Sequence, residues 1–167
     1  MKATSNKASI SPLRVLCFTL LLGAVALAVA PQSSWATDQV PFKGRAEGAV
    51  TSVLPDPGGV LLTVLTEGKA THLGRFSREE EVLFNPITGT LAGDIVFTAA
   101  NGDELFGIVA GGFISPTTAI GTYTFTGGTG RFQNASGGAD FVGFTSDGIH
   151  LTVEFEGTLS SVGANKK

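Results

Sequence analysis

The chain of 167 residues contains a single cysteine, Cys17. One cysteine cannot form a disulfide within the chain, so the fold must be held together by packing rather than by covalent cross-links. Cys17 lies near the start of a long apolar stretch, not at its end, which argues against the acylated cysteine of a lipoprotein. A chain near 150 residues buries roughly 68–70% of its unfolded surface, which is enough for one stable domain.

Positive charge is also scarce. The chain has 11 lysines and arginines against 14 acidic residues, and Lys2, Lys7 and Arg14 leave only eight for the rest. Nucleic acids and anionic membranes require clustered positive charge, so neither is a predicted partner. The two histidines, His72 and His150, lack companions at metal-ligand spacing, and no cofactor motif is present. We therefore predict neither a metal nor a cofactor.

Residues 1–36 are predicted to be a signal peptide. The basic start precedes an almost wholly apolar stretch at 15–30, and Ser34 and Ala36 place small residues at positions −3 and −1 for a signal peptidase. The rival interpretation is an uncleaved anchor, but 16 apolar residues are fewer than the roughly 20 that span a bilayer. The predicted mature protein, 37–167, is a single domain that is secreted or periplasmic, without stable membrane insertion.

No segment repeats apolar residues at helical spacing for more than two turns, which indicates an all-β fold. The best helical candidate, 78–84, is only seven residues long. The chain has 23 glycines, and Gly, Pro, Asn and Asp clusters recur at short intervals, as is typical of turns. The predicted strands are 42–53, 60–67, 70–78, 89–99, 104–114, 119–126, 136–146 and 149–159.

Eight consecutive strands joined by short turns predict an up-and-down antiparallel β-barrel. Closure is favoured by the charges of the first and last strands, because antiparallel pairing would bring Lys43 and Arg45 beside Glu156 and Glu154. The alternative is two solvated faces that never meet. An eight-stranded barrel has room for packed side chains or for one small ligand, but not for a channel.

The run TGGTGRFQNASG, residues 126–137, resembles the turn of the allene oxide cyclase-like barrel superfamily, which includes plant dirigent proteins and many small exported bacterial proteins. Two further pieces, 70–76 and 97–103, are similar to segments of the bacterial members. The resemblance implies the same barrel, an apolar pocket and assembly into homo-oligomers, often trimers. It implies no catalytic residue, because Arg131 and Ser136 stand where dirigent proteins commonly carry an acidic residue and an arginine.

Three residues are candidates for ligand binding: His72, Tyr123 and Asp140. His72 could face inward or hydrogen-bond within the wall, and inward it would be the best general acid or base available. Tyr123 shares a face with Phe125, and Asp140 is a carboxylate inside a β-type run. The acidic run 79–81 is interpreted as a solvated face without function.

The predicted function is non-enzymatic binding of a small apolar ligand. The alternatives are a cofactor-free isomerase or cyclase of the allene oxide cyclase kind, and a structural or interaction module whose barrel is filled by phenylalanines. Strand 105–114 is apolar on both faces, which favours a homo-oligomer, most simply a trimer. The small residues expected to leave space for a ligand are Gly44, Ala46, Gly48, Gly93, Gly107, Ala110, Gly111, Gly121, Ala139 and Gly143.

Overall fold

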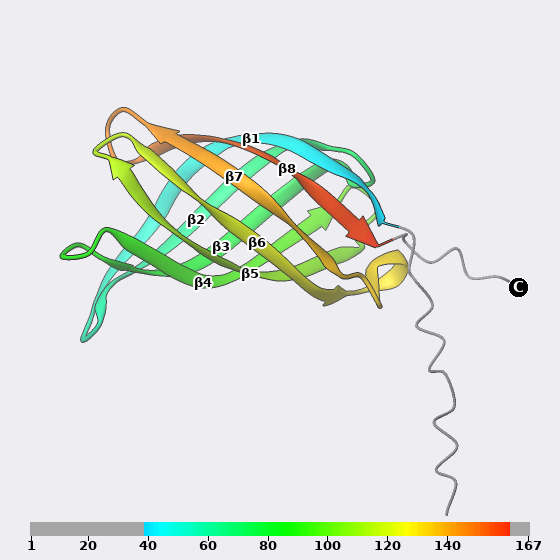
Figure 1. Cartoon of the computed structure of the whole chain (residues 1–167), viewed down its shortest axis with the longest axis horizontal. Helices are drawn as coiled ribbons and strands as arrows, with labels where there is room; N and C mark the ends of the chain where they lie inside the picture. Colours follow the sequence, from blue (N-terminus) through cyan, green and yellow to red (C-terminus); the bar gives the residue numbers. More distant parts are fainter. Residues whose placement is uncertain (1–38, 161–167) are drawn as a thin grey trace, which may run out of the picture. The chain divides into compact units, whose positions relative to one another are not determined.

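The computed structural model describes residues 39–160, and the predicted signal peptide lies outside them. Each strand pairs antiparallel with the next and the last pairs with the first, which confirms the predicted eight-stranded closed barrel (Figure 1). No helix in residues 39–160 is long and apolar enough to cross a membrane. The strands are β1 (Gln39–Asp56), β2 (Gly59–Ala70), β3 (Gly74–Asn85), β4 (Thr90–Ala99), β5 (Glu104–Ser115), β6 (Thr118–Gly128), β7 (Gly137–Thr145) and β8 (His150–Ser160).

The closing seam forms in the predicted register. Lys43 lies opposite Glu156, with 2.6 Å between Nζ and Oε1, and Arg45 lies opposite Glu154, with 3.4 Å between Nη1 and Oε1. Both pairs are exposed, and such pairs contribute only about 0–1 kcal/mol each. The charge pairs instead help to specify the register of β1 against β8. A slip by one residue would turn the buried Phe42 outward.

The largest difference from the predicted strands concerns β2 and β3. A turn was expected at 67–69, but β2 continues to Ala70 and the chain reverses at 71–73. The Thr71 side chain holds this turn against β1, because its hydroxyl accepts from the Lys43 N–H at 3.0 Å and donates to the Pro41 carbonyl at 3.0 Å. His72 has a φ of 65°, a left-handed conformation in which histidine is enriched among non-glycine residues.

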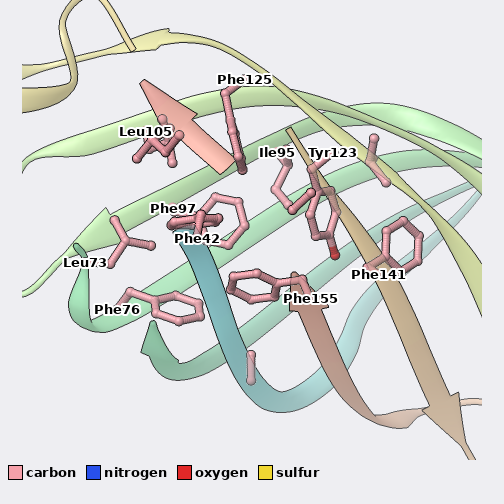
Figure 2. Packing of buried hydrophobic residues seen from close by; sticks show 14 of the residues in the cluster. Phe42, Leu73, Phe76, Ile95, Phe97, Leu105, Tyr123, Phe125, Phe141 and Phe155 are labelled. Atoms are coloured by element: carbon pink, nitrogen blue, oxygen red, sulfur yellow. The ribbon is translucent and has the colours of Figure 1, made fainter. Parts of the chain in front are cut away.

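Five phenylalanines fill the middle of the barrel, and we call them the aromatic plug. Phe97 is central to it, with ring centroids 5.4 Å from Phe76 and 5.6 Å from Phe155 (Figure 2). Such offset and edge-to-face pairs add to the free energy of burial. The remaining members are Phe42, with its ring centroid 6.2 Å from that of Phe97, and Phe125, at 6.1 Å.

Two inward glycines make room for aromatic rings instead of leaving empty space. A Cβ atom on Gly44 would lie 2.8 Å from Cε2 of Phe155, and one on Gly121 would lie 2.6 Å from Cε1 of Phe141. Both distances are shorter than packed carbon atoms allow. The aromatic rings therefore occupy the space that these glycines were expected to leave for a ligand.

One end of the barrel is closed. Between β6 and β7 the chain forms a short 3₁₀ helix, η1 (Gly130–Phe132), whose Phe132 is fully buried (Figure 1). Gly130 has a φ of 52°, a left-handed conformation that glycine adopts without a Cβ penalty. Gln39 of β1 pairs with Ser160 of β8 at the same end. Leu73, Leu105 and Leu159 are also buried there.

Candidate functional site

The opposite half of the barrel contains a cavity of about 770 Å³. Its outer lining comes from the β3–β4, β5–β6 and β7–β8 connections and from Val53 and Val60 at the adjoining ends of β1 and β2, so the cavity opens at the end away from η1. Its walls are mainly aliphatic and aromatic, and they include Leu62, Val64, Val82, Leu151 and Val153. The barrel interior is thus packed in one half and hollow in the other.

Three polar residues lie together where the cavity meets the plug, and we call Arg78, Glu80 and Tyr123 the floor cluster. Arg78 Nη1 donates a hydrogen bond of 2.8 Å to Tyr123 Oη, and Arg78 Nη2 lies 3.5 Å from Glu80 Oε1. Arg78 is 1% exposed and Glu80 is 8% exposed. Glu80 and Tyr123 line the cavity, whereas Arg78 is not among its lining residues.

The floor cluster has more hydrogen-bonding capacity than it uses. Among residues 39–160, no hydrogen-bond partner is found for Arg78 Nε, Arg78 Nη2 or Glu80 Oε1, all of which are buried. The buried Thr66 hydroxyl also has no hydrogen-bond partner among these residues, and Thr66 lies opposite Arg78 in the β2–β3 register. Buried polar atoms are nearly always paired in folded proteins, so unpaired ones point to strain or to a binding role.

The hydroxyl of Tyr123 is held protonated. Burial raises the pKa of Tyr123 well above its ordinary value, and the neighbouring Glu80 carboxylate raises it further, while Arg78 acts in the opposite direction. The ring stacks on Phe141 at 4.7 Å between centroids and meets Phe97 edge-on at 5.8 Å (Figure 2). Tyr123 thus contacts Phe97 of the aromatic plug and also lines the cavity.

The three predicted site residues are not brought together. Tyr123 lies at the cavity floor, but His72 is exposed in the 71–73 turn and Asp140 is exposed on the outer face of β7. The reason for Asp140 is strand alternation, because its neighbours Ala139 and Phe141 take the inward positions. The other histidine, His150, is exposed and lies 2.7 Å from Asp147 through Nδ1 and Oδ2.

The interpretation of residues 79–81 as a solvated run was wrong for its central member. Glu79 and Glu81 are exposed, but Glu80 points into the barrel. Strand periodicity could have identified Glu80 as inward-facing. Residues two apart share a face of a strand, and the apolar Phe76 and Val82 flank Arg78 and Glu80 on the same face. When Phe76 and Val82 face the barrel interior, the Arg78–Glu80 ion pair therefore faces the interior as well.

Most of the small residues expected to line a cavity do not line it. Of that set only Gly143 borders the cavity. A Cβ atom on Gly143 would meet its nearest neighbours, Val153 Cγ2 and the Ala119 carbonyl oxygen, at 3.7 and 3.9 Å, which are ordinary contacts. In residues 39–160 no group of three or more His, Cys, Asp or Glu side chains could hold a metal ion.

Comparison with known proteins supports the fold. No protein-family model matches the sequence, and a search of curated proteins gives no significant match. The similar solved structures include that of the pterocarpan synthase dirigent protein GePTS1, with TM-score 0.57 and 14% identity, and the match covers 75% of this chain and 89% of that chain. The pterocarpan synthase dirigent protein PsPTS1, with TM-score 0.56 and 15% identity, covers 76% of this chain and 97% of its own.

At these identities the likeness establishes a dirigent-like barrel and nothing about chemistry. The dirigent part of the resemblance seen in the sequence is thereby confirmed for the fold. Membership of the allene oxide cyclase-like group and a bacterial type of protein remain predictions.

Proposed function

We propose that the protein binds one small, largely apolar molecule in the barrel cavity, and that it does so outside the cytoplasm. The observation that carries this proposal is the cavity itself, which has a volume of about 770 Å³, mainly apolar walls and one open end. Ligand pockets typically enclose about 300–1,000 Å³ and combine apolar walls with a few polar groups. The floor cluster supplies those polar groups, and the aromatic plug prevents the ligand from passing through.

Conversion of the bound molecule is a second candidate function. The solved neighbours are pterocarpan synthase dirigent proteins, so a barrel of this fold is associated with making a small molecule. In this chain the observation in favour is that Glu80 and Tyr123, an acceptor and a protonated donor, both line the cavity. Chromatography and NMR of a ligand recovered after incubation decide between the two, because a binder returns the ligand unchanged whereas an isomerase or cyclase returns an isomer of the same mass.

Blocking the cavity tests the proposal most directly. We expect Gly143→Phe to weaken binding of a neutral apolar fluorophore such as N-phenylnaphthylamine by at least about tenfold, or about 1.4 kcal/mol. The added ring points into the cavity, and the backbone tolerates a side chain at this position. Fluorescence titration measures the affinity. Saturating ligand should stabilise the wild type by about 2.7 kcal/mol at a free concentration a hundredfold above its Kd.

The matched control is Asp140→Phe, which adds the same ring on the outer face of the same strand, away from the cavity. His72→Ala and Asp140→Asn serve as further controls, since both side chains lie away from the cavity. All three should bind like the wild type. If the wild type shows no saturable binding to apolar probes, the barrel is instead a structural or interaction module.

We also propose that the protein forms a homo-oligomer, as a trimer, through the outer face of β5, β6 and β7. The apolar side chains of Phe106, Ile108, Ile120 and Val142 are exposed there, and Ile120 lies directly opposite Val142. β5 carries apolar residues on both faces: Leu105 and Val109 are buried inside the barrel, whereas Phe106 and Ile108 are exposed outside it. In the β5–β6 register Ile108 lies opposite Thr124 and Ile120 lies opposite Gly112, so the exposed apolar side chains form two groups on one face. Exposed apolar groups of this kind often mark an interface.

Light scattering tests the assembly. Ile120→Lys should reduce the molar mass to that of one subunit, because a charged side chain would be buried without a partner. Leu65→Lys on the outer face of β2 is the matched control, since Leu65 is 45% exposed and Ile120 is 42% exposed. A wild type of one subunit mass at micromolar concentration would exclude the oligomer.

A further inference from the structure

The end of the cavity carries one charged side chain. Among the described residues that line the cavity, only Glu80 is charged, and it lies beside the hydroxyl-bearing Tyr123. Arg78, which offsets this charge, is buried behind them and does not line the cavity. A molecule that slides inward between the apolar walls therefore meets a carboxylate and a phenol at the floor.

The hydrogen bonds already made at the floor limit what the entering group can be. Tyr123 Oη accepts a hydrogen bond from Arg78 Nη1, whereas Glu80 Oε1 has no hydrogen-bond partner within residues 39–160. The closest positive group, Arg78 Nη2, is 3.5 Å from Glu80 Oε1, which is ion-pair distance without a hydrogen bond. A carboxylate can only accept hydrogen bonds, so Glu80 Oε1 can be satisfied only by a ligand group that donates one.

The charge of the floor limits the donor further. A carboxylate on the ligand would meet the Glu80 carboxylate before it could reach Arg78, and like charges repel strongly in an apolar cavity. An ammonium group would compete with Arg78 for Glu80 and would leave a net positive charge in the barrel interior. An uncharged hydroxyl group donates a hydrogen bond without adding a charge.

We infer that the cavity selects an uncharged apolar molecule with a hydroxyl group at its leading end, and that Glu80 accepts the hydrogen bond from this hydroxyl. The inference rests on the proposed binding function and specifies the ligand class. Glu80 then distinguishes an alcohol from the carboxylate of the same chain length.

Displacement of bound N-phenylnaphthylamine by dodecanol, dodecanoate and dodecylammonium tests the inference. The informative quantity is the ratio of the dodecanoate Kd to the dodecanol Kd, because the shared alkyl chain contributes equally to both. Glu80→Gln removes the repelling charge and leaves Arg78 positive, so we expect this ratio to fall by at least about tenfold. His72→Ala, outside the cavity, should keep the wild-type ratio.

A second variant keeps the test valid if Glu80→Gln does not fold. Arg78→Met combined with Glu80→Met removes both charges and should also lower the ratio by about tenfold. An unchanged ratio in the charge-free variant, or tighter binding of dodecylammonium than of dodecanol to the wild type, overturns the inference while fluorophore binding still supports the proposed function. No saturable fluorophore binding to the wild type would overturn both.

Discussion

Replacing Arg78 with methionine should lower the free energy of unfolding by about 3–5 kcal/mol. Arg78 is 1% exposed, and its guanidinium is the positive group that offsets the buried Glu80 carboxylate and donates to Tyr123. Methionine nearly fills the same volume but leaves Glu80 as an unpaired charge inside the barrel. Urea denaturation followed by circular dichroism measures the loss, which amounts to a large fraction of the 5–15 kcal/mol typical of a domain.

The double variant Arg78→Met, Glu80→Met separates the ion pair from the packing. Because both charges are then absent, we expect its stability to return to within about 1–2 kcal/mol of the wild type or to exceed it, as apolar replacements of buried ion pairs often do. A double variant as unstable as Arg78→Met alone would show that the arginine stem, and not its charge, holds the structure. The expected pattern would indicate that the ion pair is maintained for the cavity and not for the fold.

Phe97→Ala should destabilise the barrel by about 3–5 kcal/mol. The Phe97 ring is fully buried and contacts the other four rings of the aromatic plug as well as Tyr123. Removing it deletes apolar contacts with every neighbour and leaves a void that close-packed surroundings can only partly fill. Thermal or urea denaturation measures the effect.

Phe144→Ala is the control for this loss, because Phe144 is 52% exposed at the cavity mouth and truncating it should cost less than about 1 kcal/mol. Equal losses at the two positions would contradict the assignment of the plug as the stabilising core.

The sequence predicted the barrel well because strand alternation and turn residues are local signals. Lys43 and Arg45 opposite Glu156 and Glu154 show that even a long-range contact was predictable, since opposite charges at matching offsets define a register. The predicted turn at 67–69 failed because Thr71 anchors the reversal through contacts with β1, which are distant in the sequence.

The candidate site was less predictable, for two physical reasons. Charged residues on both faces of β3 hide which of them is inside, so Glu80 was assigned with Glu79 and Glu81 to solvent. The space left by a glycine depends on which ring lies across the barrel, so sequence alone could not separate Gly44, which accommodates Phe155, from Gly143, which borders the cavity.

The pairing of Gln39 with Ser160 determines how the molecule can be attached to anything else. Both ends of the described chain leave the barrel at the end closed by η1, opposite the cavity mouth (Figure 1). A linker, a surface or a fused reporter joined at Gln39 or Ser160 would therefore lie at the closed end and leave the cavity mouth facing away from it. Attachment at Gln39 or at Ser160 should leave the kinetics of ligand entry and exit unchanged, which suits the barrel to surface-based binding assays.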